Sequence, residues 1–168
     1  MALIQLIGIA SNTVGELPAL GIKAPNFVLT KNDFSSASLM DYKGKKVVLN
    51  IFLSVDSEVC ASSLHAFNKQ ASQLENTVLL CISKDLPFAM NRFCGVAGID
   101  NLEMLSDYKD GSFGADYGVA FKEGPLSTLF SRAVVILDEN LNVIYTEHVP
   151  KLMDEPNYKA AMEALENV

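Results

Sequence analysis

Two stretches of the chain are almost continuously apolar. Residues 46–53 and 77–83 each contain only two polar positions, which is typical of central strands that are covered on both faces of a sheet. From Cys60 to Leu74, apolar residues recur at intervals of three and four, as on one face of an amphipathic helix. The order strand, helix, strand predicts a βαβ unit, with parallel strands joined by a right-handed crossover.

Shorter patterns predict the elements that precede this unit. Residues 3–9 and 13–17 are expected to form an opening hairpin, with Ser11 and Asn12 near its turn. The prolines and glycine within residues 18–25 favour an extended crossing segment. The other elements expected in this half are a short strand at residues 27–29 and a single helical turn at residues 38–42, stopped by Gly44.

The chain after the βαβ unit carries similar signals. Residues 87–93 suit a helix, because proline is tolerated in a first turn, and Gly95 and Gly98 are expected to end it. Residues 138–140 are polar and separate two apolar runs, which indicates a hairpin. The expected elements are a strand at residues 102–105, a short helix within residues 110–118, hairpin strands at residues 133–137 and 143–147, and a final helix opened by Pro156 and Asn157.

Together these patterns predict one α/β domain that spans residues 1–168. Its mixed central sheet should carry helices on both faces, in a thioredoxin-like fold with an N-terminal β-hairpin. A chain of 168 residues is long enough for one substantial core and too short for two.

Charge and hydropathy narrow the classes of function. The formal net charge is −7 and no basic stripe is visible, so nucleic acids and anionic membranes are not expected as partners. The apolar start of the chain lacks a basic segment and a cleavage site, and no apolar run is long enough to span a bilayer. These features indicate a cytoplasmic protein.

Three cysteines are too few for a structural disulfide framework. The chain has no CxxC or HxxxH spacing, and its two histidines, His65 and His148, are far apart and are interpreted as ordinary surface residues. No metal site or cofactor is therefore expected. The missing CxxC also argues against a thioredoxin-type reductase.

Cys60 follows the first apolar strand, in the first turn of the predicted helix. Helix amides and the positive end of the macrodipole favour a thiolate there, although a buried, inert cysteine is the common alternative. Asp56 or Ser57 is the expected N-cap, and the Ser57 hydroxyl could also bind the sulfur or a peroxide oxygen. The carboxylate of Glu58 would oppose ionisation, so it must face solvent if Cys60 is reactive.

The other two cysteines differ in their surroundings. Cys94 precedes Gly95, which offers the local mobility that a second reactive thiol needs, but taken alone Cys94 is equally well a helix-end apolar residue. Cys81 lies in the middle of a predicted strand and is interpreted as an inert part of the core.

Four stretches together resemble the bacterial thiol peroxidases, a branch of the atypical two-cysteine peroxiredoxins. They are FLSVDSEVC at residues 52–60, NTVLLCISKDLPFA at residues 76–89, RFCG at residues 92–95, and GPL followed by RAVVILDEN at residues 124–126 and 132–140. The likeness extends over almost the whole chain.

The resemblance implies a role for four residues. Cys60 matches the cysteine that attacks peroxide, Cys94 the resolving cysteine, Ser57 the hydroxyl residue ahead of the reactive thiol, and Arg132 the active-site arginine. One position departs from the pattern: Leu53 stands where the family has a proline that shapes the loop and shields the thiol.

The activity that the resemblance implies is reduction of hydrogen peroxide and organic hydroperoxides in antioxidant defence. Cys60 would become a sulfenic acid, condense with Cys94 to an intramolecular disulfide, and be regenerated by thioredoxin. A homodimer is implied as well. The alternatives are a redox sensor with the same fold, supported by Leu53 and Glu58, and a thiol–disulfide oxidoreductase, disfavoured by the missing CxxC.

Overall fold

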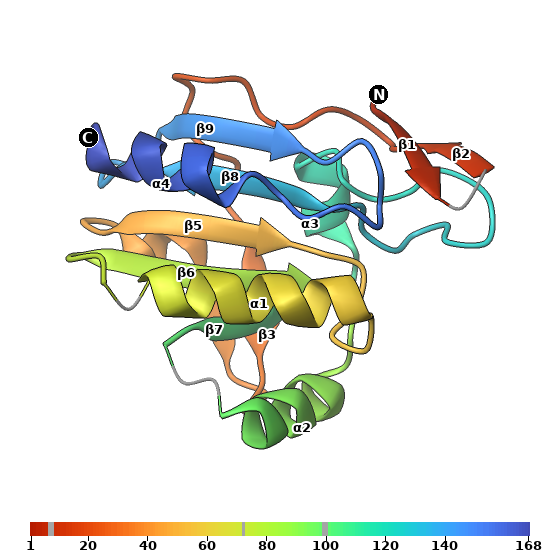
Figure 1. Cartoon of the computed structure of the whole chain (residues 1–168), viewed down its shortest axis with the longest axis horizontal. Helices are drawn as coiled ribbons and strands as arrows, with labels where there is room; N and C mark the ends of the chain where they lie inside the picture. Colours follow the sequence, from red (N-terminus) through yellow and green to blue (C-terminus); the bar gives the residue numbers. More distant parts are fainter. Residues whose placement is uncertain (7–8, 72, 99–100) are drawn as a thin grey trace.

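The structure is a computed structural model that describes residues 1–6, 9–71, 73–98 and 101–168 (Figure 1). Its strands are β1 (Leu3–Leu6), β2 (Ile9–Asn12), β3 (Val28–Lys31), β4 (Ser36–Ser38), β5 (Lys46–Ile51), β6 (Thr77–Ser83), β7 (Glu103–Ser106), β8 (Ala133–Leu137) and β9 (Val143–His148). Its helices are the 3₁₀ turn η1 (Leu39–Tyr42), α1 (Glu58–Ala71), α2 (Pro87–Ala97), α3 (Ser112–Asp116) and α4 (Tyr158–Glu166).

Seven strands form one mixed sheet in the order β4-β3-β7-β6-β5-β8-β9. Strand β6 pairs in parallel with both β5 and β7, whereas β8 pairs antiparallel with β5 and with β9. The predicted parallel arrangement of the two apolar runs and the predicted C-terminal hairpin are both confirmed. The remaining two strands, β1 and β2, form a separate antiparallel hairpin.

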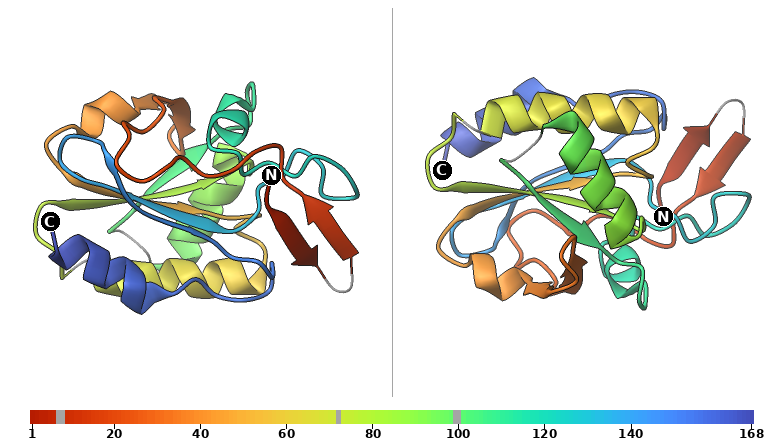
Figure 2. Two further views of the ribbon diagram at one scale, coloured as in Figure 1. Left: turned by 90° about the horizontal axis from the view of Figure 1, so that it is seen from above. Right: turned by 90° about the horizontal axis from the view of Figure 1, so that it is seen from below.

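Helices cover both faces of the sheet, as predicted. One apolar cluster lies between the sheet and helices α1, α2 and α4, and it contains Cys60, Cys81 and Met90. A second cluster on the opposite face packs η1 and α3 against the sheet. Figure 2 shows α1 and α4 together on one side of the sheet and η1 and α3 on the other. The thioredoxin-like fold expected from the sequence is therefore confirmed.

The opening hairpin is present, but its predicted boundaries are wrong. Ser11 and Asn12 belong to strand β2, where Asn12 pairs with Leu3, so they do not lie at the turn; residues 7–8 of the predicted first strand lie outside the described residues. Residues 13–17 are not a hairpin strand, because the chain there turns toward a distant segment: the Val14 amide donates to the carbonyl of Ala120 at 2.9 Å. This long-range contact has no signal in the local pattern.

Helix α2 runs one turn further than predicted. Gly95 lies inside it, and the helix ends at Gly98, which adopts the left-handed conformation with φ of 61° and donates its amide to the carbonyl of Cys94. A left-handed residue closes a helix and is usually glycine, so Gly98 alone is the stop signal. No helix within the described residues is both long enough and apolar enough to cross a membrane.

Candidate active site around Cys60 and Arg132

The turn that leads into α1 is shaped by backbone and hydroxyl contacts. Beyond the end of β5, the Phe52 amide still donates to the carbonyl of Ile82 at 3.1 Å. The Ser57 hydroxyl then accepts from the amide of Cys60 at 3.4 Å, and the Ser57 carbonyl accepts from the amide of Ala61 at 3.0 Å. Of the two N-cap candidates, the structure therefore gives Ser57 this position.

Cys60 lies in the first turn of α1 and is 0% exposed. Its side chain packs into the apolar cluster between α1 and the sheet. Glu58, two residues earlier, is exposed, so its carboxylate meets the condition that a reactive Cys60 imposes. All three cysteines carry free thiols.

Arg132 brings a buried positive charge to the Cys60 sulfur. Its side chain is 1% exposed, and Nη2 donates to the Cys60 Sγ at 3.3 Å. Nη2 and Nε also donate to the carbonyl of Leu152, at 3.2 and 3.4 Å, while Nη1 is buried with no hydrogen-bond partner among the described residues. A buried charge is unfavourable unless it is paired, so this guanidinium suits a site that holds an anion.

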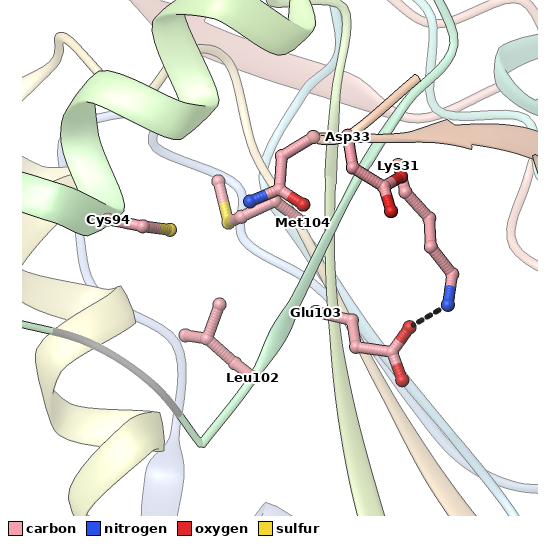
Figure 3. A pocket seen from close by; sticks show the side chains of 7 residues that line it. Lys31, Asp33, Cys94, Leu102, Glu103 and Met104 are labelled. Atoms are coloured by element: carbon pink, nitrogen blue, oxygen red, sulfur yellow. Dashed lines mark ion pairs between the residues drawn. The ribbon is translucent and has the colours of Figure 1, made fainter. Parts of the chain in front are cut away.

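Cys94 lies on α2, half-buried, and packs against the same apolar cluster as Cys60. Burial raises the pKa of the Cys94 thiol. Cys94 and Met104 line a cavity of about 370 Å³, and an ion pair of 3.1 Å between Lys31 and Glu103 lines the same cavity (Figure 3). Cys94 is thus the one of the three thiols that a solute can reach in the reduced protein.

Cys81 is fully buried in β6, as expected for a core residue. Burial raises the pKa of its thiol, and the Nδ2 of Asn50 donates a weak hydrogen bond to the sulfur at 3.9 Å. The neutral thiol therefore acts as a small apolar side chain.

A polar pair next to Arg132 is present in the structure without having been expected from the sequence. The sequence predicts an ordinary surface position for His148, but this residue is partly buried, and its Nε2 lies 2.6 Å from the hydroxyl oxygen of Ser131, whose proton is donated to the carbonyl of Val119. Burial, with a smaller contribution from the N-terminal ammonium, lowers the pKa of His148 to about 4. Strand pairing creates this contact, so the only local hint was the serine directly before Arg132.

Asp85 was missed as well. Its carboxylate accepts from the hydroxyl of Ser54 at 2.7 Å and from the amide of Val55 at 2.9 Å, in the turn that leads to Cys60. In the sequence this aspartate lies within the motif at residues 76–89, where no pattern indicates its role. Among the described residues, no group of three or more histidine, cysteine, aspartate or glutamate side chains could hold a metal ion.

Comparison with known proteins places the chain in a family. A family model described as Redoxin matches residues 19–162. Curated thiol peroxidases of Mycobacterium bovis and Mycobacterium tuberculosis are 52% identical over 165 residues, which covers 98% of this chain and 99% of theirs.

Solved structures show the same similarity. A peroxiredoxin-like protein from Aquifex aeolicus superposes with a TM-score of 0.93 at 30% identity, covering 99% of this chain and 97% of that one. A thiol peroxidase from Chromobacterium violaceum, at 24% identity, shares the fold with a TM-score of 0.90 and coverage of 99% and 96%. The chain therefore belongs to the redoxin family, on its thiol peroxidase branch, and is an enzyme of the peroxidase class.

Proposed function

We propose that this enzyme reduces hydrogen peroxide and organic hydroperoxides with Cys60 as the nucleophile and Cys94 as the resolving thiol. The observation that carries the proposal is the 3.3 Å contact between Arg132 Nη2 and Cys60 Sγ, at a site shielded from water. A positive charge this close to sulfur, in a low-dielectric environment, stabilises the anionic thiolate that attacks peroxide.

In the first step, the Cys60 thiolate attacks one peroxide oxygen. A sulfur–oxygen bond forms, the oxygen–oxygen bond breaks, and the departing oxygen takes a proton to leave as water or an alcohol. The Nη1 of Arg132, which has no partner among the described residues, offers a donor to the oxygen that develops charge. The Ser57 hydroxyl accepts from the Cys60 amide, which leaves its own proton free to donate to the sulfur or to the peroxide.

Access to Cys60 requires local opening, because the thiol exposes none of its surface. A cavity of about 250 Å³ lies beside the turn, lined by Asp56, Arg92, Phe93 and Val96. Fluctuation of the turn and of α2 at this cavity would admit a small oxidant.

In the second step, the Cys94 thiol condenses with the Cys60 sulfenic acid, giving a disulfide and water. Helices α1 and α2 pack against the same apolar cluster, so the two thiols start on one face of the sheet. Disulfide geometry is strict, and the buried Cys60 and half-buried Cys94 can meet only if both helices loosen locally.

In the third step, a dithiol donor reduces the disulfide by exchange, and the family resemblance points to thioredoxin. The half-exposed position of Cys94 supports attack on its sulfur, which would release the Cys60 thiolate. The proposal extends, on the same resemblance, to a cytoplasmic homodimer in which residues 1–168 form one domain.

The deciding experiment is turnover of peroxide with thioredoxin as donor, combined with mass mapping of the disulfide after one equivalent of peroxide. Wild type should form a Cys60–Cys94 linkage, Cys60→Ser should lose turnover, and Cys94→Ser should stop at the sulfenic acid. The matched control is Cys81→Ser, which should keep both turnover and linkage. Survival of most activity in Cys60→Ser would refute the assignment.

The redox-sensor alternative is weakened, because Glu58 faces solvent and no longer argues for a poor nucleophile. A sensor would be oxidised once and then turn over slowly, so steady-state turnover with excess thioredoxin separates the two functions. Reduction of insulin disulfides tests the oxidoreductase alternative in the same preparation.

A further inference from the structure

Asp85 joins the carboxyl ends of three neighbouring parallel strands. Beyond β5, its carboxylate accepts from the Ser54 hydroxyl and the Val55 amide. At the end of β6, the same carboxylate accepts from the Ser83 hydroxyl at 2.7 Å. At the end of β7, the Ser106 hydroxyl donates to the backbone carbonyl of Asp85. Among the described residues, no other carboxylate accepts hydrogen bonds from both a side chain and a backbone amide of this turn.

These bonds are strong enough to shape the turn. Hydrogen bonds to an ionised acceptor are about twice as strong as neutral ones, and burial of the donor residues Val55 and Ser83 limits competition from water at two of the contacts. The Ser54 hydroxyl also accepts from the amide of Asp56 at 3.2 Å, which extends the restraint by one residue. No proline stands between Pro25 and Pro87 to hold the turn instead.

The anchored turn leads directly to the reacting groups. Ser57 follows Val55 by two residues and places the first turn of α1, with Cys60, against Arg132. Any shift of residues 54–55 therefore moves the hydroxyl and the sulfur together. A displacement of about 1 Å at reacting atoms can lower a rate about 100-fold.

We propose that Asp85 is a positioning residue for peroxide reduction. It holds the turn so that Ser57 and Cys60 keep their positions relative to Arg132. This inference rests on the proposed function, because it concerns the rate at which Cys60 meets peroxide. Asp85 touches neither the sulfur nor the substrate, and it acts through the turn.

The test compares two substitutions in a Cys94→Ser background, where oxidation stops at the Cys60 sulfenic acid. Asp85→Ala removes every side-chain contact and should lower the second-order rate of oxidation by about 10- to 100-fold. Asp85→Asn should restore most of the rate, because its amide oxygen can accept from Val55 while its amide nitrogen donates to the Ser54 hydroxyl.

A second readout separates positioning from general stability. A looser turn exposes the buried thiol, so Asp85→Ala should speed alkylation of Cys60 by iodoacetamide while it slows oxidation. Asp107→Asn is the matched control, because Asp107 is a buried carboxylate at the end of the next strand that accepts from Gly114 and not from the turn. It should lower the melting temperature without changing either rate.

If Asp85→Ala fails to fold, Ser54→Ala removes one of the same contacts and should lower the oxidation rate by a smaller factor. Equal rates in the folded Asp85→Ala variant and its parent, an unchanged rate in Ser54→Ala, or an equal slowing in Asp107→Asn would each overturn the inference. Failure of the Cys94→Ser parent itself to oxidise at Cys60 would refute the proposed function instead.

Discussion

At the scale of single residues, the most informative side chain is the buried guanidinium of Arg132. It shares one nitrogen between the Cys60 sulfur and the Leu152 carbonyl and leaves another without a partner among the described residues. Stability alone does not explain a charge buried in this way, because apolar residues would fill the same space at a lower desolvation cost.

Replacement of Arg132 by methionine should therefore affect rate and stability differently. We expect oxidation of Cys60 to slow by about 100-fold or more, as when a donor to a developing oxyanion is removed, while the free energy of unfolding stays equal or rises. Stopped-flow oxidation and urea unfolding measure the two quantities. Lys159→Met, which removes an exposed ion pair with Glu163 on α4, is the control and should change neither.

His148 predicts a specific dependence of stability on pH. Its pKa is about 4 in the folded protein against an ordinary value of 6.5, so between these values the unfolded state binds more protons. Its contribution to stability is complete above pH 6.5 and is lost as the pH falls toward 4, by up to about 3 kcal/mol. Urea unfolding at pH 7 and at pH 4.5 should show a smaller difference in His148→Gln than in wild type. An identical difference would contradict the assignment.

At the scale of elements, helix α2 must balance order against mobility. It carries Cys94 and contains Gly95 in its interior, where a Cβ would meet no atom of the described residues within 4 Å. Glycine weakens a helix interior by about 0.5–1 kcal/mol relative to alanine. The helix is therefore easier to loosen at the residue next to the resolving thiol.

Gly95→Ala should slow the disulfide step and leave the first step unchanged. The added helix stability corresponds to roughly a threefold slower conversion of the sulfenic acid to the disulfide. Gly98→Ala should do the reverse, because its left-handed φ of 61° strains any residue with a side chain and frays the end of α2. Rapid-quench mass spectrometry follows both steps, and equal disulfide rates in the two variants would argue against loosening of α2.

At the scale of the whole molecule, the order of the strands brings the site residues together at one end of the sheet, where β5 and β6 finish. Strand β8 runs antiparallel to β5, so its beginning lies beside the end of β5, with Ala133 opposite Ile51. Arg132 immediately precedes β8, and the turn toward Cys60 follows β5. Strand β6 runs parallel to β5, so Asp85, which follows β6, lies at the same end of the sheet.

This arrangement predicts where the oxidised protein differs from the reduced one. Hydrogen exchange should increase in the first turn of α1 and along α2 once the Cys60–Cys94 disulfide forms, because both must loosen for the sulfurs to meet. Strands β5, β6 and β8, which hold the core, should keep their protection. Uniformly faster exchange throughout the sheet would indicate global destabilisation instead.

The sequence by itself determined the elements whose cause is local. Continuous apolar runs predicted β5 and β6, a 3.6-residue period predicted α1, and proline marked the start of α2, whereas its end at Gly98 rather than Gly95 came from the structure. The resemblance to thiol peroxidases also selected Cys60, Cys94, Ser57 and Arg132 before any distance was known. Each of these signals is carried by neighbouring residues or by a motif.

Tertiary structure alone decided which side chains meet. Arg132 is 72 positions from Cys60, and Asp85 is 30 positions from Val55, so only the pairing of β5 with β8 and β6 brings them together. The same holds for the Ser131–His148 pair and for the true boundaries of the opening hairpin. A hydrogen bond between distant residues leaves no periodicity in the chain, because its partners are chosen by strand order and packing.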